Sequence, residues 1–265
     1  MFTLLTKSII KKIYRSKIAV NITDSGISYK AYYNPKTLES FRQIAEYIIN
    51  KYRQKIENRR LIVAIAGPPG SGKSTISKIL YNMIREKIKN LYLVPLDGFH
   101  YTNEYLKSKT INFNNRLYTL YDLKGAHFTF DYNNFKKHIG LIISGHNIYW
   151  PLYSRKIHNP ISEGIKINGN GIIIIEGNYL LLNKFPWNET CGLYDIKIFI
   201  KPYRFLLKKR IIKRKLAGGH SKKYARKHYR LTDRYNISLV LKNVCKYDIL
   251  IKQCGLFKYK YIQKG

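Results

Sequence analysis

The part of the sequence that points most directly to chemistry is the glycine-rich segment Gly67-Pro68-Pro69-Gly70-Ser71-Gly72-Lys73-Ser74. Its spacing of glycine, lysine and serine is that of a phosphate-binding loop. Glycines let backbone N–H groups turn inward around phosphate oxygens, and a helix that begins there adds a partial positive charge. In such a loop Lys73 reaches the β and γ phosphates, Ser74 offers its hydroxyl to Mg²⁺, and Thr75 is a further candidate contact. A glycine-rich turn without a ligand would need neither the lysine nor the hydroxyl.

Two carboxylates follow apolar runs that have the composition of buried strands. Glu176 ends the run Ile172–Ile175, and Asp97 follows Leu91–Leu96. At these strand ends we expect Glu176 to face the magnesium ion and Asp97 to accept the proton of an attacking hydroxyl. The alternatives are a solvent-exposed acid at Glu176 and a turn-forming role at Asp97. His100 is a weaker candidate, because a histidine among aromatic residues more often serves packing.

A strongly basic segment supplies candidates for contacting a transferring phosphoryl group. Arg210 and Arg214 lie one helical turn apart, and Gly218-Gly219 follow as a flexible joint. On a lid that closes over the site, the two arginines would offset the charge of the phosphoryl group and exclude water. The competing interpretation is a solvated basic helix face in a very basic protein.

The elements that position these residues alternate between strands and helices. Short β-branched runs, each followed by a loop and a helical stretch, are typical of buried parallel strands in an α/β sheet. The predicted strands are Leu61–Ala66, Leu91–Leu96, Ile172–Glu176, Ile196–Ile200 and Asp248–Ile251. The predicted helices are Lys73–Ile88, Asp131–Ile143, Tyr203–Leu216, Tyr224–Tyr229 and Ile237–Val244. Ligands of such sheets bind at the carboxyl ends of the strands.

The chain is predicted to consist of an N-terminal extension, residues 1–60, and a main domain, residues 61–265, with a lid at about residues 208–232. Within the extension, the alternation over Gly26–Tyr33 predicts a short strand. Apolar residues at helical spacing from Leu38 to Ile49 predict an amphipathic helix that packs on the core.

The composition is strongly basic, with 49 Lys and Arg against 15 Asp and Glu and a formal net charge of +34. The basic residues are scattered and accompany abundant Ile, Asn and 24 Tyr, so we attribute them to compositional drift. We therefore expect no specific nucleic-acid partner, only non-specific binding of polyanions. No apolar run is long enough to span a membrane, and the first ten residues do not read as an export signal. Three widely spaced cysteines, Cys191, Cys245 and Cys254, favour reduced thiols and a cytoplasmic location.

Several motifs beside the phosphate-binding loop make the chain resemble the phosphoribulokinase/uridine kinase family of P-loop kinases. The resemblance is strongest to bacterial members described only as nucleoside/nucleotide kinase family proteins. The motifs cover roughly residues 60 to 245 and are Leu96–His100, Lys124–Asp131, Trp150–Pro160, Glu176–Leu182, and Arg214–Gly219 with Asp233 and Asn236. The resemblance implies an α/β, three-layer P-loop NTPase fold with a mostly parallel sheet flanked by helices and a basic helical lid. It also implies ATP as donor with Mg²⁺, Asp97 as base, and a hydroxyl of a nucleoside, sugar or pantothenate-like molecule as acceptor.

By the same resemblance, the acceptor pocket is lined by Lys124–Asp131 and by the stretch that contains Tyr153, Arg155 and His158. Ordinary loop packing is an equal alternative for these three residues. The chain departs from the related pattern at three positions, Ser154 and Asn159 in place of acids and His127 in place of proline. These departures leave the nucleotide site intact and the acceptor undefined.

Two other functions remain open at this point. One is a nucleotide-dependent ATPase or switch that binds nucleic acid, and the other is a decayed kinase that keeps ATP binding. The sequence carries no nucleic-acid recognition motif, which favours the small-molecule kinase. The oligomeric state, a homodimer included, is not specified by the sequence.

Overall fold

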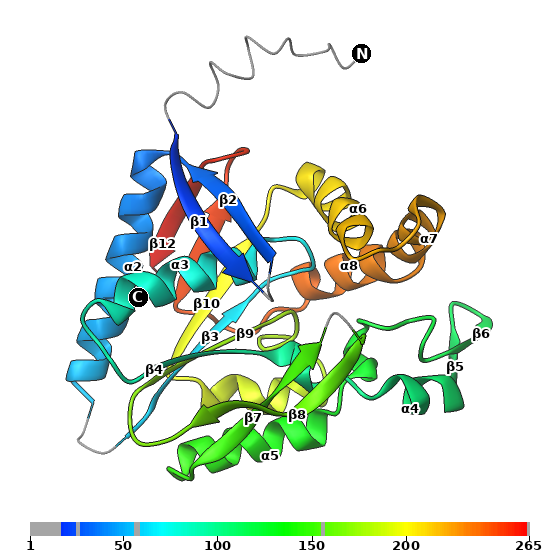
Figure 1. The fold of residues 1–265 in the computed structure, drawn as a ribbon, viewed down its shortest axis with the longest axis horizontal. Coiled ribbons are helices and arrows are strands. Elements are labelled where there is room, and N and C mark those ends of the chain that lie inside the picture. The colour runs from blue at the N-terminus through cyan, green and yellow to red at the C-terminus, as the bar shows by residue number, and fades with distance from the viewer. Residues whose placement is uncertain (1–16, 25–26, 56–58, 155–156, 264–265) are drawn as a thin grey trace.

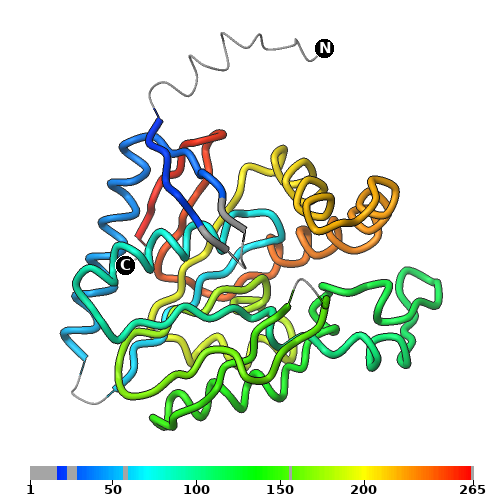
Figure 2. Tube along the Cα trace, in the orientation of Figure 1, coloured from blue at the N-terminus to red at the C-terminus, as the bar shows by residue number. Residues whose placement is uncertain are grey.

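The structure, a computed structural model, describes residues 17–24, 27–55, 59–154 and 157–263 (Figures 1 and 2). Its central sheet is made of β3 (Leu61–Ala66), β4 (Leu91–Pro95), β9 (Ile172–Gly177), β10 (Ile196–Lys201), β11 (Ile249–Gln253) and β12 (Tyr259–Gln263). The strand order is β12–β11–β10–β3–β9–β4. All neighbours are parallel except β12, which pairs antiparallel with β11 at one edge. The five strands predicted from apolar runs are therefore present, and they form the mostly parallel sheet of an α/β fold.

Helices cover both faces of this sheet. The helices on one face are α2 (Pro35–Arg53) and α3 (Lys73–Arg85), and those on the other are α5 (Tyr132–Ile143), a 3₁₀ turn (Trp187–Leu193) and α8 (Arg234–Lys242). Because successive strand residues point to opposite faces, Val63 packs under α2 and α3, whereas Ala64 belongs to the core under α5. Within the described ranges, none of the helices has the length and apolar character needed to cross a membrane.

Among the described residues, three two-stranded hairpins lie outside the central sheet. They are β1 (Ile18–Asp24) with β2 (Ile27–Tyr33), β5 (Thr110–Phe113) with β6 (Arg116–Thr119), and β7 (Ile148–Ser154) with β8 (Asn159–Ile167). A short helix, α4 (Asn103–Ser108), precedes β5. Of these elements the sequence predicted the β2 strand alone.

The segment predicted as a lid, about residues 208–232, falls within a helical layer built by α6 (Leu207–Ala217), α7 (Lys222–His228), a π-turn (Tyr229–Asp233) and α8, and we use the name lid for this layer. Figure 1 shows α6, α7 and α8 gathered at one end of the molecule, on the same side as the β5–β6 hairpin. Leu207 and Ile211 of α6 and Ile237 of α8 form a small buried cluster that holds the layer together. The lid therefore has an apolar core of its own, separate from the two cores of the sheet.

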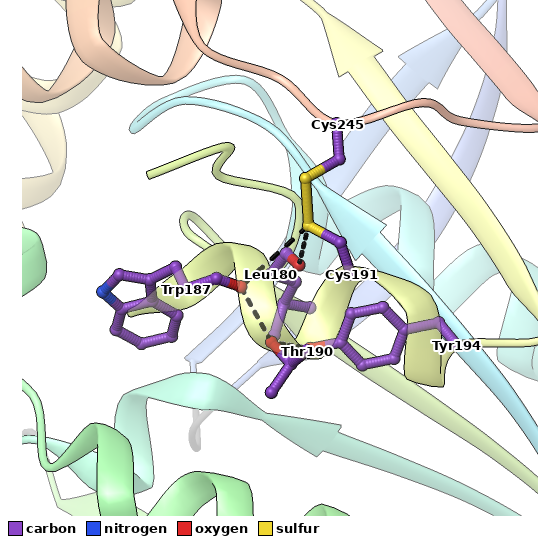
Figure 3. Close-up of a disulfide and its surroundings, with 6 residues drawn as sticks. All are labelled: Leu180, Trp187, Thr190, Cys191, Tyr194 and Cys245. Carbon is purple, nitrogen blue, oxygen red and sulfur yellow. Dashed lines mark hydrogen bonds between the residues drawn. A yellow bond between two sulfur atoms is a disulfide. The ribbon is translucent and has the colours of Figure 1, made fainter. Parts of the chain in front are cut away.

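Cys191 and Cys245 form a disulfide (Figure 3), so the prediction of reduced thiols was wrong for these two residues. They are 54 residues apart in the sequence, and nothing in their spacing signals the pairing. A β-bridge between Leu182 and Val244 brings the end of α8 beside the Trp187–Leu193 turn, which leaves the two Cα atoms 6.6 Å apart. The thiol of Cys254 is free and exposed.

Candidate active site

The loop between β3 and α3 has the backbone of a phosphate cradle. Gly70 and Gly72 have φ values of 75° and 91°, in the left-handed region that favours glycine. A Cβ on Gly67 would lie 2.8 Å from the carbonyl oxygen of Ile200, so a larger residue would not fit there. The hydroxyl of Ser71 is buried and has no hydrogen-bond partner among the described residues. An orphaned buried hydroxyl in a glycine-rich loop at the start of a helix fits an anionic ligand such as a nucleoside triphosphate.

Lys73 begins α3 and lies buried behind the loop. Its Nζ donates to Oδ1 of Asn178 at 2.6 Å and to the carbonyl oxygen of Pro68 at 3.3 Å. Burial lowers the pKa of Lys73 to about 8, and the nearby carboxylates of Glu176 and Asp97 oppose that shift. Neither hydrogen-bond partner carries a charge that would neutralise the ammonium. Its positive charge is therefore available to an incoming phosphate.

Ser74 and Glu176 form the pair of oxygen ligands that magnesium would need. The Ser74 hydroxyl donates to Oε1 of Glu176 at 2.9 Å, across the boundary between α3 and the adjacent end of β9. The described residues contain no group of three or more acidic, histidine or cysteine side chains that could hold a metal without help. Mg²⁺ at nucleotide sites typically takes one or two side-chain oxygens and completes its shell with phosphates and water, so this pair fits the ion.

Asp97 lies in a 3₁₀ turn, Leu96–Phe99, directly after β4. The turn is packed so tightly that a Cβ on Gly98 would lie 1.9 Å from the carbonyl oxygen of Pro151 in β7. On its other side, a Cβ on Gly177 would lie 2.5 Å from Cβ of Leu96. The turn that carries Asp97 is therefore held between two close contacts, one with the backbone of β7 and one with Gly177 at the end of β9.

One pocket joins most of these side chains. The residues predicted from the sequence that line it are Pro69, Lys73, Ser74, Asp97, His100, Glu176 and Arg214. The lining residues that had not been predicted individually are Lys124, Gly125, Phe130, Gly177, Asn178, Lys215, His228 and Asp233. All of these except His228 lie in the motifs that carry the family resemblance, whereas no local pattern marks His228 as a site residue.

Two predicted residues, Thr75 and Arg210, lie outside the residues that line the pocket. The Thr75 hydroxyl pairs with the hydroxyl of Tyr29 at 2.8 Å, which connects α3 to the β1–β2 hairpin. Nη1 of Arg210 donates to the carbonyl oxygen of Gly70 at 3.3 Å and to Oε1 of Gln253 at 3.1 Å. Of the two predicted lid arginines, Arg210 thus supports the loop backbone, whereas Arg214 lines the pocket.

Of the predicted acceptor residues, Tyr153 lies on β7, His158 directly precedes β8, and the ring of His100 lies beside that of Tyr153. Tyr153 packs edge-on against His100 with ring centroids 5.5 Å apart, and the ring of His158 lies 5.4 Å from that of His220. Arg155 lies outside the described residues. His100 stacks on Phe130, and burial lowers its pKa to about 4, so the imidazole is neutral at pH 7.

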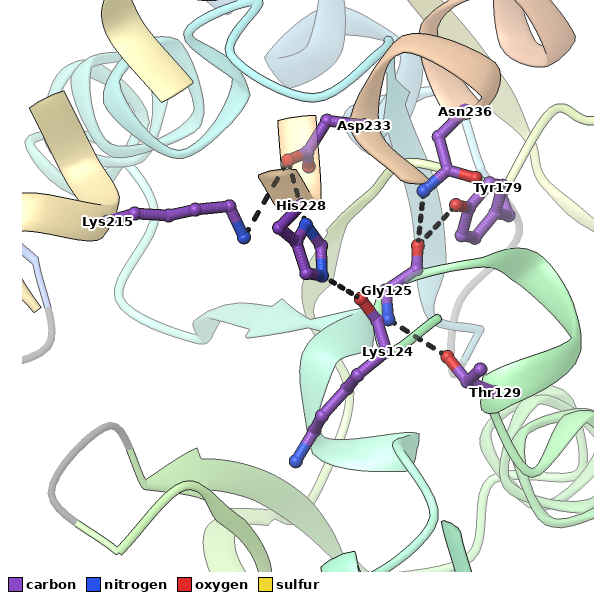
Figure 4. Close-up of polar contacts among 8 residues, drawn as sticks. All are labelled: Lys124, Gly125, Thr129, Tyr179, Lys215, His228, Asp233 and Asn236. Carbon is purple, nitrogen blue, oxygen red and sulfur yellow. Dashed lines mark hydrogen bonds and ion pairs between the residues drawn. The ribbon is translucent and has the colours of Figure 1, made fainter. Parts of the chain in front are cut away.

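A network of hydrogen bonds joins the lid to the acceptor side of the pocket (Figure 4). Nδ1 of His228 lies 3.0 Å from Oδ2 of Asp233, and its Nε2 donates to the carbonyl oxygen of Lys124 at 3.1 Å. Lys215 approaches the same carboxylate at 3.7 Å. Burial would raise the pKa of Asp233, but hydrogen bonding to His228 and the charges of Lys215 and Arg214 outweigh it and lower that pKa.

Comparison with known proteins identifies relatives along most of the chain. The sequence model described as "Phosphoribulokinase / Uridine kinase family" matches residues 62–238. "Uncharacterized protein YggC" of Escherichia coli K12 is 27% identical over 91% of this chain and 98% of its own length. "Putative uridine kinase C227.14" of Schizosaccharomyces pombe is 35% identical over 75% of this chain and 85% of its own. A solved structure titled "putative fructose transport system kinase", from Silicibacter sp. TM1040, aligns with a TM-score of 0.70 at 25% identity over 80% of this chain and 98% of its own.

Proposed function

The chain belongs to the phosphoribulokinase/uridine kinase family of small-molecule P-loop kinases, and on that premise we propose that it transfers the γ-phosphoryl group of ATP to a hydroxyl of a small metabolite. The observation that carries the proposal is the shared pocket of Lys73, Ser74, Asp97 and Glu176. Phosphoryl transfer needs a phosphate-binding cation, oxygen ligands for a metal and a proton acceptor. These four side chains supply all three within one pocket.

The proposed reaction assigns one role to each of these residues. The phosphate-binding loop and Lys73 hold the β and γ phosphates while Asp97 accepts the proton of the acceptor hydroxyl. The hydroxyl oxygen forms a bond to the γ phosphorus as the bond to the bridging oxygen breaks, and ADP leaves. Ser74 and Glu176 would hold Mg²⁺, which offsets negative charge on the phosphates when it is bound. Arg214 is the lid arginine placed to contact the transferred group.

The names of the relatives suggest which acceptors to test first. Two of the names refer to uridine and to fructose transport, so nucleosides and sugars head the screen, followed by pantothenate. His100 lines the pocket and Tyr153 packs against it, so we propose these two as its acceptor-facing wall, with His158 at its rim.

A coupled ADP-release screen over these metabolites, with Lys73→Ala as the inactive control, tests the proposal. In the screen we expect ADP release that depends on one acceptor. Asp97→Asn should then lower kcat by roughly 10²- to 10⁴-fold, the usual contribution of a general base, while ATP affinity changes by less than about twofold. Unchanged turnover would remove Asp97 from the mechanism. ADP release stimulated by nucleic acid and by no metabolite would support a nucleic-acid-dependent ATPase, and ATP binding with no acceptor at all would support a decayed kinase.

A further inference from the structure

Lys124 enters the acceptor side of the pocket from a backbone that is fixed on several sides. Its own carbonyl oxygen accepts from Nε2 of His228, and the next carbonyl, that of Gly125, accepts from Tyr179 at 2.5 Å and from Asn236 at 2.9 Å (Figure 4). Two of these donors belong to the lid helices and one follows β9. In Figure 4 the Lys124 side chain extends away from all three donors. The ammonium is therefore carried by an immobilised peptide segment.

The ammonium of Lys124 has only uncharged partners. Nζ donates to Oδ1 of Asn103 at 2.6 Å and to the carbonyl oxygen of His158 at 2.8 Å, and it lies 5.1 Å from the centre of the Tyr153 ring. In the described part of the chain no carboxylate forms an ion pair with it, whereas Lys215 has Asp233. A half-buried charge without a counter-ion favours an anion from outside.

The β7–β8 hairpin beside Lys124 carries no acidic side chain at positions 154 and 159, so these positions do not neutralise the charge of the ammonium. Ser154 and Asn159 are paired across β7 and β8, and both are neutral. Asn159 uses its Oδ1 to accept from the backbone N–H of Asn103, the same residue that contacts the Lys124 ammonium. Ser154 and Asn159 therefore add no charge to the surroundings of Lys124.

We propose that the phosphoryl acceptor carries an anionic group, a carboxylate or a phosphate ester, and that Lys124 binds that group while Asp97 faces the reacting hydroxyl. The inference rests on the proposed kinase function and narrows its substrate class from hydroxylated metabolites in general to hydroxylated anions. Asp97 and Lys124 line the same pocket, so one small molecule can present its hydroxyl to the first and its anionic group to the second.

Matched sets of acceptors test the charge requirement. At saturating MgATP we would compare an aldose, its aldonic acid and its phosphate ester, and likewise a nucleoside with its monophosphate. A charge-assisted hydrogen bond predicts kcat/KM roughly 10- to 100-fold higher for an anionic member than for its neutral partner. The acid and ester arms distinguish a carboxylate from a phosphate. Turnover of the neutral members at equal or higher kcat/KM would overturn the inference while leaving the kinase function intact.

The variant Lys124→Met tests whether this residue recognises the charge. We expect the KM of the anionic acceptor to rise roughly 10- to 100-fold and its preference over the neutral partner to disappear, with the KM of ATP within about twofold. Lys107→Met is the matched control, since Lys107 is exposed and also lies over a tyrosine ring, that of Tyr121 at 5.2 Å. A rise confined to the KM of ATP would mean that Lys124 contacts the donor instead. Lys124→Arg, which keeps the charge, should retain the anionic preference.

A binding measurement makes the test independent of turnover. With the phosphate-binding loop filled by a non-hydrolysable ATP analogue and Mg²⁺, titration with inorganic phosphate should reveal a second anion site in the wild type that is weakened at least tenfold in Lys124→Met. Absence of a Lys124-dependent site would refute the inference even if no acceptor had been identified.

The pH dependence gives a further readout. Burial lowers the pKa of Lys124 to about 8, and the ammonium is charged below its pKa, so the KM of the anionic acceptor should rise as pH increases through about 8. The titratable groups around Lys124 are Asp97, His100 and His228, which line the same pocket, and Tyr153, whose ring centre lies 5.1 Å from Nζ; His158 contacts Nζ through its backbone carbonyl oxygen. In Lys124→Met this rise in the KM of the acceptor should vanish. The KM of ATP, measured at each pH, serves as a control for changes at the nucleotide site. A rise that persists in Lys124→Met would contradict the assignment.

Discussion

Gly98 directly follows Asp97, the proposed proton acceptor, and replacing Gly98 by alanine would move Asp97 without changing any polar group. The added Cβ would lie 1.9 Å from the carbonyl oxygen of Pro151 and 2.9 Å from the backbone nitrogen of Leu152. Because Cβ contacts below 3.0 Å essentially never occur, the turn or β7 must move by about 1 Å. Both contacts are with backbone, so no side-chain rotation relieves them.

A displacement of this size has a defined effect on catalysis. Misplacing a reacting group by about 1 Å lowers kcat by roughly 10²-fold. Overpacking should also lower the free energy of unfolding by about 1 to 3 kcal/mol, which corresponds to about 2 to 12 °C in Tm for a protein of this size. ATP affinity should stay within about twofold, because the phosphate-binding loop lies on other elements.

The assay compares kcat, ATP affinity and Tm of Gly98→Ala with those of Gly140→Ala. Gly140 lies inside α5, and a Cβ added there would have no atom within 4 Å, so its replacement should leave kcat unchanged and stabilise the helix by about 0.5 to 1 kcal/mol. If Gly98→Ala retains wild-type kcat, either the turn does not position Asp97 or Asp97 is not the proton acceptor. Loss of ATP binding instead would place the damage in the nucleotide site.

Two further predictions concern the pair of proposed magnesium ligands, Ser74 and Glu176, and the disulfide. Glu176→Gln keeps a hydrogen-bond acceptor for Ser74 but removes the negative charge. The Mg²⁺ concentration needed for half-maximal activity should therefore rise roughly tenfold or more. An unchanged Mg²⁺ titration would show that Glu176 does not face the metal. Opening the Cys191–Cys245 bridge, by reductant or by Cys191→Ser, should lower the free energy of unfolding by about 2 to 5 kcal/mol in thermal or denaturant melts, and Cys254→Ser should have no such effect. Equal melting curves with and without reductant would show that the bridge does not form.

The parts of the fold that could be predicted are those whose signal is local. The run Leu61–Ala66 is β-branched and apolar because β3 is buried on both faces, and the phosphate-binding loop follows it directly. The sequence did not predict the β7–β8 hairpin because Pro151 interrupts β7 and Gly164 interrupts β8. A Cβ on Gly164 would clash with the carbonyl oxygen of Trp150, which is why glycine stands there. Proline and glycine inside an apolar run argue against a strand. In this hairpin the shift in register between Trp150 and Leu152 accommodates Pro151.

The parts of the site that could not be predicted depend on contacts between distant elements. Asp97 and Glu176 could be singled out because each directly follows an apolar run of the sequence; in the structure Glu176 lies at the end of β9 and Asp97 in the turn after β4. His228 lies on the short helix α7, where neighbouring residues are also basic, and it becomes a pocket residue only because that helix lies against the loop at Lys124. The Cys191–Cys245 disulfide also depends on a contact between distant segments, because the β-bridge between Leu182 and Val244 brings the two cysteines together.

The contact between α2 and β12 determines the order in which this protein can complete its sheet. The backbone N–H of Tyr259 donates to the Thr37 hydroxyl at 3.0 Å, across 222 residues, and that of Asn34 donates to the carbonyl oxygen of Phe257. During synthesis α2 therefore emerges long before the strand that it packs against, and closing so long a loop is entropically unfavourable until the intervening sheet has formed. Both elements lie outside the matched residues 62–238. A fragment trimmed to that match would lose the partners of the buried side chains under α2, and its exposed sheet face would favour aggregation over folding.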